Sequence, residues 1–492
     1  MEESELQREN FGMAESRLEN LPDDLLLHIL SFLPTKCAVR TSILSKRLNS
    51  FWKSHWTSLS NLDFDDDETF SKTEAQGLAA GTSFADVVDK FLIRQNGSPI
   101  RNFRLSCRRR LRYKLQDVHR WICAAVDLNV EKLDLSMFLV PRISLPISLY
   151  NCKTLLVLKL MGNFREIGSL SVCLPSLKVL NMTLRPYSDD SFQRLLSGCP
   201  VLEELSLHGA TYMRAFEICV PTLKKLNVEF INAGREDIKV EINTPSLETL
   251  SICDLNRRHY LIKNLDKVQE ASLTLCKQLS YRDCIFKILN TLPSVQSLTL
   301  THKTTKVRFF FKQANQFFSI CYYCHMIEWI SFAFSVQSLL GVARLDLPEF
   351  DKLVYLHFDL TSFNWRFLTS LLQKSPNLEV LVIQRTPCGA ELDPTLRPSF
   401  SLGEESCWTE PSSVPVCLSS HLTKFKFRGY QGLEAAAELD FVRYVLDKSS
   451  VLDTVTIQPP MLLNLEQRHG LVINLCSLRR ESKTCLEFEY KE

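Results

Sequence analysis

Few residues of this chain are spaced as metal ligands or catalytic groups. Cys321, Cys324 and His325 form a C-x-x-C-H fragment, which has the ligand types of a zinc site. A structural zinc site needs four ligands, and no second pair has suitable spacing, so we interpret the fragment as core packing and expect no metal. Phosphate-binding loops and the common hydrolase motifs are missing from the sequence, so we expect no catalytic residues and no cofactor.

Two charged runs are the other candidates for chemistry. The acidic run could bind a cation, but it lacks the ordered spacing of a calcium loop, so we interpret it as a solvated turn. The basic run could hold a phosphate-rich ligand or form a solvated loop, and no comparable run elsewhere completes a pocket. The acidic run is Asp63, Asp65, Asp66, Asp67 and Glu68, and the basic run is Arg101, Arg104, Arg108, Arg109, Arg110, Arg112 and Lys114.

The composition is that of a soluble protein with several domains or one repeat array, at 492 residues with 45% hydrophobic residues. The 58 basic and 56 acidic residues nearly balance, so we expect no nucleic-acid partner. The polar start MEESELQREN is not a secretory signal, and no run of about 18 apolar residues occurs, so we expect no membrane association. The 17 cysteines then indicate reduced thiols and a cytoplasmic or nuclear protein.

Residues 21–34, LPDDLLLHILSFLP, have the pattern of a short amphipathic helix. Asp23 and Asp24 suit its start, and Pro34 marks its end. A second apolar segment follows, and Ser45 is a plausible N-cap for a third helix that carries Leu48. Three short helices in so few residues bury little surface, so we expect this module to dock on a partner or to cap the neighbouring domain.

The order of residues in this module resembles the F-box family, with a match over about residues 17 to 68. The resemblance implies that the module docks a Skp-type adaptor, which joins a cullin scaffold. It assigns adaptor binding to Leu21, Pro22, Leu25, Ile29, Leu30, Leu33, Pro34 and Leu44. Leu48 departs from the pattern, because family members commonly carry Trp there. Some plant F-box hormone receptors bind an inositol phosphate, which is the ligand class that the basic run would take.

A Pro-x-(Leu/Val)-x-x-Leu-x-apolar phrase recurs along the chain, for example as PSLKVLNM from Pro175 and PVLEELSL from Pro200. Its leading residues Leu177, Leu202, Leu223 and Leu247 are 25, 21 and 24 residues apart by subtraction, which is the period of leucine-rich repeats. We expect each phrase to be a strand of one curved parallel sheet, with its leucines buried and the intervening residues exposed. Looser copies begin at Leu59, Ile100, Val130, Leu155, Val268, Leu353, Leu422 and Leu452, with a doubtful copy at Ile327.

The segments between the phrases change to helical spacing at Ser191, Arg282 and Asn364, which predicts helices and loops on the convex side. The fold class is therefore α/β, a leucine-rich-repeat solenoid behind a three-helix F-box. Cys152, Cys173, Cys199 and Cys219 each precede a phrase by a few residues, so we expect small buried side chains there.

The stretch from Trp408 resembles the FBD domain of plant F-box proteins. The resemblance rests on Trp408, Pro415, Cys417, Leu418, Tyr430, Gly432, Glu438, Phe441, Leu446 and Leu452. The alternation of Phe425 and Phe427 indicates that this region continues the array. The predicted domains are a tail at 1–16, the F-box at 17–58, leucine-rich repeats at 59–385, a linker at 386–410 and the FBD-like region at 411–492.

Three functions remain open from the sequence. The first is a non-catalytic, substrate-binding subunit of a ubiquitin ligase, in which the repeats hold an unknown target protein. The second is a repeat-based interaction scaffold that does not engage the ligase, for which Leu48 is the argument. The third is a small-molecule receptor within the ligase, which requires an apolar pocket with convergent polar groups.

Overall fold

A computed structural model describes most of the chain and divides it into two compact units, 1–213 and 214–492. The described residues are 21–31, 35, 41, 44–55, 59–66, 84–95, 97–107, 114–137, 143–165, 171–184, 189–209, 215–230, 238–254, 258–275, 287–301, 347–360, 365–385, 408–430, 436–459, 465–476 and 484–489.

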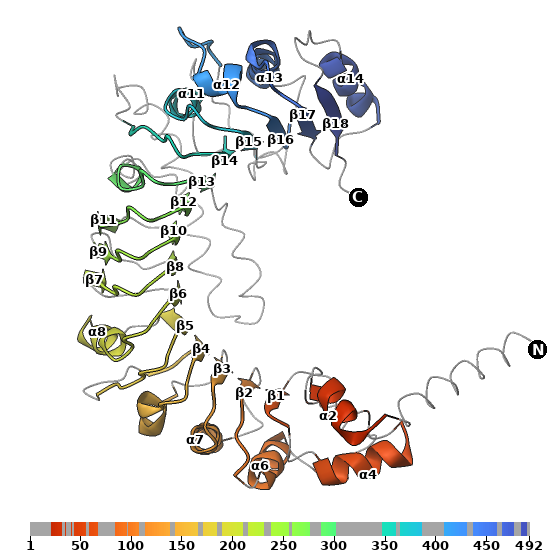
Figure 1. Ribbon diagram of the computed structural model, residues 1–492, viewed down its shortest axis with the longest axis vertical. Helices are drawn as coiled ribbons and strands as arrows, with labels where there is room; N and C mark the ends of the chain where they lie inside the picture. Colours follow the sequence, from red (N-terminus) through yellow and green to blue (C-terminus); the bar gives the residue numbers. More distant parts are fainter. Residues whose placement is uncertain are drawn as a thin grey trace, which may run out of the picture. The chain divides into compact units, whose positions relative to one another are not determined.

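The described part of the first unit has two N-terminal helices and a parallel sheet whose strands pair in chain order (Figure 1). The helices before the sheet are α2 Asp23–Ser31 and α4 Lys46–His55. The strands are β1 Asn61–Asp65, β2 Asn102–Ser106, β3 Lys132–Met137, β4 Val157–Gly162, β5 Val179–Leu184 and β6 Glu204–Gly209. Between the strands lie α6 Phe84–Arg94, α7 Leu115–Asp127, the 3-10 helix η3 Ile147–Asn151 and α8 Asp189–Ser197.

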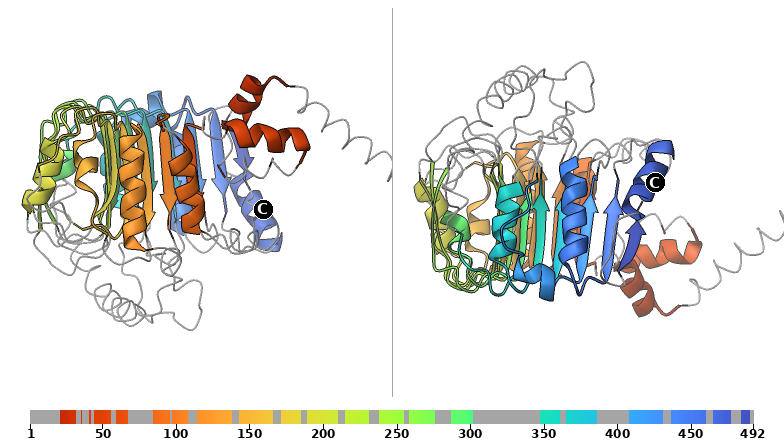
Figure 2. Two further views of the ribbon diagram at one scale, coloured as in Figure 1. Left: turned by 90° about the horizontal axis from the view of Figure 1, so that it is seen from below. Right: turned by 90° about the horizontal axis from the view of Figure 1, so that it is seen from above.

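Each strand buries alternate side chains, because successive residues of a strand point to opposite faces of the sheet. Leu180 of β5 is in register with Leu158 of β4 and Leu205 of β6, and all three are buried. The helices lie over this face of the sheet (Figure 2). Apolar side chains of α6 and α7 complete the core, among them Val88, Trp121 and Ile122. The opposite face carries the polar strand residues, and we call it the open face.

The second unit holds a longer parallel sheet in which strands again follow chain order. These strands are β8 Lys225–Phe230, β10 Thr249–Asp254, β12 Glu270–Leu275, β13 Ser297–Thr301, β14 Tyr355–Asp359, β15 Val380–Gln384, β16 Lys424–Arg428, β17 Thr454–Gln458 and β18 Cys485–Phe488. Its helices are α11 Trp365–Gln373, α12 Val416–Ser420, α13 Ala436–Lys448 and α14 Leu465–Cys476.

Both units confirm the predicted solenoid of leucine-rich repeats, with helices on the side opposite the open face (Figure 1). Leu177, Leu202, Leu223 and Leu247 are buried as expected. The strand bounds need a correction, because each predicted leading residue lies two positions before its strand. Leu177, for example, precedes β5, which begins at Val179. The leading residue therefore packs from the turn that enters the strand.

A second, three-stranded sheet was not expected from the sequence. It replaces helices on the outer side of the second unit and consists of β7 Ala215–Ile218, β9 Ile238–Asn243 and β11 Arg258–Lys263. The helices predicted from Ser191 and Asn364 are confirmed as α8 and α11. Of the helix predicted from Arg282, only the part from Lys287 is described, and it is helical. The doubtful repeat at Ile327 and the Cys321 fragment lie outside the described residues.

Aromatic side chains join the last repeats to the segment around Trp408. The ring centroid of Trp365, on α11, lies 4.9 Å from that of Phe441, on α13. Trp408 lies 4.8 Å from Phe441 and 5.6 Å from Trp365. Phe425 of β16 contacts the same cluster at 6.1 Å from Phe441. The region that resembles FBD thus shares one core with the repeat before it, and β15, β16 and β17 pair without interruption.

None of the helices in the described ranges has the length and apolar composition needed to cross a bilayer.

Candidate adaptor-binding and target-binding surfaces

Helix α2 carries two apolar stripes on neighbouring faces, one buried and one exposed. Leu26 and Leu30, four residues apart, are buried inside the N-terminal module. Leu25 and Ile29 have the same spacing, yet they are 50% and 42% exposed. A helix of this size needs only one apolar stripe for its own packing, so the second stripe is available to a partner.

The predicted adaptor-binding residues fall into three groups. Leu25, Ile29 and Leu44 are exposed, the last at 54%, and Pro22 is exposed beside the half-buried Leu21. Leu30 is buried in the module, so in the free chain it supports the helix from within. Leu33 and Pro34 lie outside the described residues. We call Leu25, Ile29 and Leu44 the exposed apolar set.

Polar contacts fix helix α4 against α2. Ser45 caps α4 as predicted, since its Oγ accepts a hydrogen bond from the Leu48 backbone N–H at 3.2 Å. The Arg47 guanidinium donates to the Leu21 carbonyl at 2.5 Å and to the Asp23 carboxylate at 3.2 Å. Leu48, the residue that departs from the family pattern, is buried beside these contacts. Its side chain therefore belongs to the core of the module.

The module is also attached to the first strand of the solenoid. The Thr35 hydroxyl accepts a hydrogen bond from the Asp63 backbone N–H at 2.7 Å and donates to the Asn61 carbonyl at 3.4 Å. Thr35 is buried. The module thus covers the start of the sheet, which is what a repeat array needs at its end.

The acidic and basic runs meet on the open face of the first unit, which the sequence did not predict. Asp63 of β1 is in register with Arg104 of β2, and their side chains form an ion pair at 2.7 Å. Asp65 lies 3.5 Å from the same guanidinium. The interpretation of the acidic run as a solvated turn is therefore wrong for these two residues, because they lie in a strand. It is also wrong for Asp66, which is fully buried. Residues 67–68 and 108–112 of the two runs lie outside the described residues.

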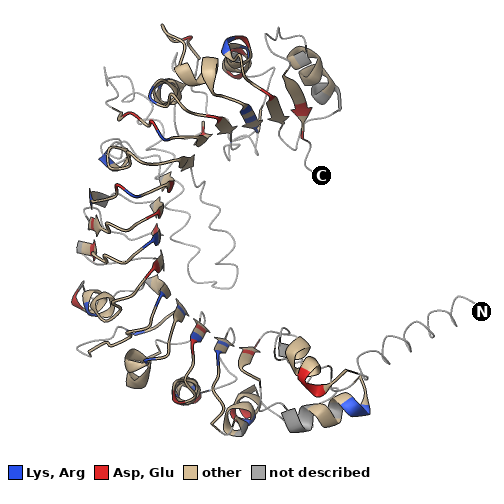
Figure 3. Cartoon of the chain, in the orientation of Figure 1, with Lys and Arg blue, Asp and Glu red and all other residues tan. Residues whose placement is uncertain are grey.

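The charge row continues across the sheet. Arg104 is in register with Asp134 of β3, which is in register with Lys159 of β4. Burial raises the pKa of Asp134, while Lys159 and Arg104 lower it and Asp63 raises it further. Opposite charges alternate along this row, so the open face of the first unit has little net field (Figure 3).

The open face of the second unit changes in character along the sheet. Small hydroxyl residues dominate β10 and β13, for example Ser251 and Thr299. Towards the C-terminus the side chains are larger. His357 of β14 donates from Nε2 to Gln384 of β15 at 3.2 Å. Burial lowers the pKa of His357, the hydrogen bond to Gln384 raises it, and the positive charge of Arg428 lowers it again.

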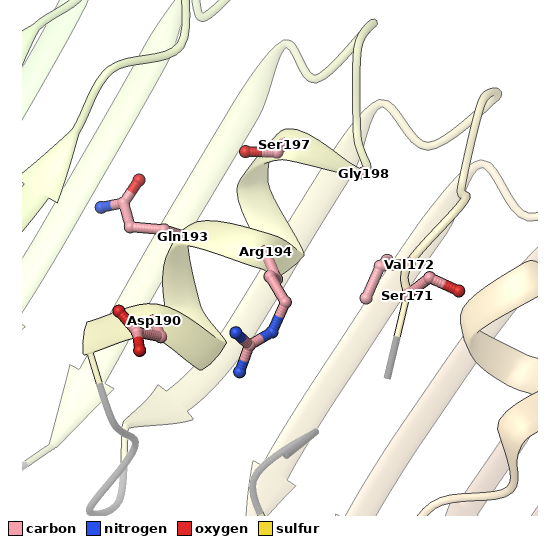
Figure 4. Close-up of a pocket in the computed structure, with 7 residues that line it drawn as sticks. All are labelled: Ser171, Val172, Asp190, Gln193, Arg194, Ser197 and Gly198. Carbon is pink, nitrogen blue, oxygen red and sulfur yellow. The ribbon is translucent and has the colours of Figure 1, made fainter. Parts of the chain in front are cut away.

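One groove lies on the outer side of the first unit (Figure 4). It has a volume of about 510 Å³ and opens widely to solvent. It is lined by Ser171 and Val172 of a loop, by Asp190, Gln193, Arg194 and Ser197 of α8, and by Gly198. It lacks the enclosed apolar wall that a small-molecule receptor needs.

The cysteines expected to be buried divide into two pairs. Cys152 and Cys199 are buried, and burial raises the pKa of the Cys199 thiol to about 12. Cys173 and Cys219 are exposed, so the prediction is wrong for them. Cys173 comes directly before the buried Leu174, and Cys219 comes directly before the buried Val220. The side chain of each cysteine therefore points outward. The residues that the structure describes contain no group of three or more His, Cys, Asp or Glu side chains placed to hold a metal.

The fold and surfaces define a protein with a small helical docking module on a leucine-rich-repeat solenoid, and comparisons with known proteins agree. The profile of the F-box domain matches residues 18–58, the leucine-rich repeats of FBD-associated F-box protein At5g56370 match 118–263, and the FBD profile matches 410–457.

Relatives in Arabidopsis thaliana are similar over nearly the whole length. Putative FBD-associated F-box protein At3g50710 is 31% identical, covering 95% of this chain and 98% of its own. FBD-associated F-box protein At5g60610 is 32% identical, covering 90% and 99%. FBD-associated F-box protein At3g52670 is 29% identical over 97% and 98%. The chain belongs to the plant F-box/FBD/leucine-rich-repeat family, as its sequence predicts.

Proposed function

We propose that this protein is the substrate-binding subunit of a cullin-based ubiquitin ligase. Its F-box docks a Skp-type adaptor, which joins a cullin scaffold, and its repeats hold a target protein near the ubiquitin-conjugating enzyme. The chain brings the target close to the conjugating enzyme and does not itself form or break covalent bonds, so it is not an enzyme. We expect it to act in the cytoplasm or nucleus, without a nucleic-acid or membrane partner.

The exposed apolar set carries this proposal. Leu25, Ile29 and Leu44 expose large apolar surface on a module whose core is already filled by other side chains. Arg47 of α4 is hydrogen-bonded to the Leu21 carbonyl, and Thr35 links the module to the first strand of the sheet. A pre-positioned apolar surface of this kind loses little conformational entropy when a partner covers it.

Binding of the full chain to a purified plant Skp-type adaptor tests the proposal. A Leu25→Ala/Ile29→Ala variant should lose about 2 kcal/mol or more of binding free energy, because a few buried anchors dominate most interfaces. Ile93→Ala is the matched control, since Ile93 lies on α6 of the same unit and is 78% exposed. Wild-type affinity in the double variant would exclude this surface as the docking site.

The scaffold alternative depended on Leu48. Its buried position supports a role in module stability rather than in the partner surface. If the intact chain, with its F-box folded, fails to bind any adaptor, the scaffold function takes the place of the ligase function.

A further inference from the structure

Strand β16 has an unusual outward side. Its sequence KFKFR buries Phe425 and Phe427 in the core, so that Lys424, Lys426 and Arg428 all face the open side. No other described strand has a basic residue at each of its outward positions. Figure 3 shows the basic colour on β16. This strand lies within the FBD match, for which the comparisons give no role.

Among the residues that the structure describes, one of the three positive charges has an acidic partner. Lys426 Nζ lies 2.7 Å and 2.6 Å from the two carboxylate oxygens of Glu489, just after β18. Lys424 is exposed and Arg428 is partly exposed, and neither forms an ion pair with a described carboxylate. Glu487 of β18 is aligned with Lys426, through Thr456 of β17, and not with Lys424 or Arg428.

Apolar side chains lie directly beside these charges. Val380 of β15 is in register with Lys424, and Tyr355 of β14 is in register with Val380. Val380 and Tyr355 are both partly exposed. Val354, which precedes β14, is exposed as well. The open face here therefore has an apolar row across β14 and β15 that ends at Lys424 of the positive strand.

We infer that this surface, formed by Lys424, Arg428, Val380 and Tyr355, binds an acidic segment of the target protein. Aspartate or glutamate side chains of the target pair with Lys424 and Arg428, and an apolar side chain next to the one at Lys424 packs on Val380 and Tyr355. The inference rests on the proposed function, because the segment belongs to the protein that the ligase recognises. We call this surface the β16 site.

The chemistry of the β16 site favours a peptide over a nucleic acid. Nucleic-acid binding draws its affinity from many phosphate contacts, on the order of six to ten in a specific complex. Two available cations beside an apolar strip provide too few such contacts. They suit a short peptide, in which charge gives orientation and specificity and the apolar contact adds affinity.

Selection of peptides by the full chain, held in complex with its adaptor, tests the inference. From a library of short random peptides, the wild-type protein should enrich sequences that combine Asp or Glu with a large apolar residue. For the best peptide, fluorescence anisotropy should show that Lys424→Glu/Arg428→Glu weakens binding by about tenfold or more, with a smaller loss at high salt.

A matched control separates this site from general charge effects. Lys239→Glu/Arg443→Glu reverses the same two residue types within the second unit, but Lys239 lies on the outer sheet and Arg443 on α13. The control should keep wild-type peptide affinity, and both double variants should keep the wild-type melting temperature. The inference would be overturned if the library showed no acidic enrichment, or if the β16 variant kept its peptide affinity. It would also be overturned if both variants lost affinity equally, or if a single-stranded oligonucleotide bound more tightly than the peptide.

Co-purification of the adaptor is measured in the same samples and tests only the proposed function. Loss of adaptor with intact peptide binding would count against the ligase function and leave the β16 site standing. Adaptor binding without selection of acidic peptides would count against the β16 site and leave the ligase function standing.

Discussion

Single leucines hold the repeats together because each is buried against its equivalents in neighbouring strands. Leu205 of β6 is buried and in register with Leu180 of β5. When such a side chain is shortened, its neighbours cannot move in to fill the space, because the strand ladder holds them in register. Removing it leaves a cavity that the sheet fills poorly.

Leu205→Ala should therefore lower the free energy of unfolding by about 2 to 5 kcal/mol. Ser206→Ala is the control, because Ser206 is on the same strand but faces the open side. Chemical denaturation of both variants gives the comparison. Equal stabilities would mean that Leu205 does not face the core.

His357 should make stability depend on pH. Burial, with Arg428 adding to it, lowers the pKa of His357 below its ordinary value of 6.5, so the folded chain favours the neutral ring. The unfolded chain then binds more protons as the pH falls through 6.5, and the free energy of unfolding should decrease. Stability should rise as the pH returns above that value.

Thermal melts of wild type and His357→Gln from about pH 5 to pH 8 measure this effect. The variant keeps a hydrogen-bonding side chain but cannot be protonated, so its melting temperature should change less with pH. The same slope in both proteins would show that other groups cause the dependence.

At the scale of elements, periodicity predicted the main sheet because each repeat carries its own signal. The phrase around Leu247, for example, identifies β10 even though its start is displaced by two residues. The outer sheet was missed because its strands lie where helices are usual. Val240 and Ile242 of β9 alternate in the way a strand requires, and this signal was available in the sequence.

The surfaces were predicted less completely than the sheet. Periodicity assigned both Leu26 and Leu25 to one helix, but it did not show which stripe faces inward. The pairing of Asp63 with Arg104 depends on strand register between residues 41 positions apart, which local patterns do not contain. Contacts set by register appear only once the strands are aligned.

The aromatic cluster predicts that the FBD region and the repeat before it unfold together. Phe441→Ala should lower the free energy of unfolding by about 3 to 5 kcal/mol, because Phe441 is buried and contacts Trp365, Trp408 and Phe425. Hydrogen exchange should rise in α11 as well as in α13. Asp440→Ala, at an exposed neighbouring position, should change neither.

If Phe441→Ala speeds exchange in α13 alone, the FBD region is a separate folding unit despite the shared core. Faster exchange in both helices would mean that the repeats depend on this region for their C-terminal end, as stacked repeats depend on their neighbours.

At the scale of the molecule, the exposed apolar set and the β16 site belong to different compact units. A protein that connects a ligase to its target needs two surfaces that bind independently, because each partner must be held while the other exchanges. Substitutions at sites that share no side chains usually have additive free energies. The two surfaces should therefore be uncoupled.

This predicts a simple result for a four-residue variant that combines Leu25→Ala/Ile29→Ala with Lys424→Glu/Arg428→Glu. Its loss of adaptor affinity should equal that of the first pair alone, and its loss of peptide affinity should equal that of the second pair alone, each within about 0.5 kcal/mol. Titrating each ligand in the presence and absence of the other measures the coupling directly. A larger difference in either titration would mean that adaptor binding changes the target site, since coupling free energies between two ligands are reciprocal.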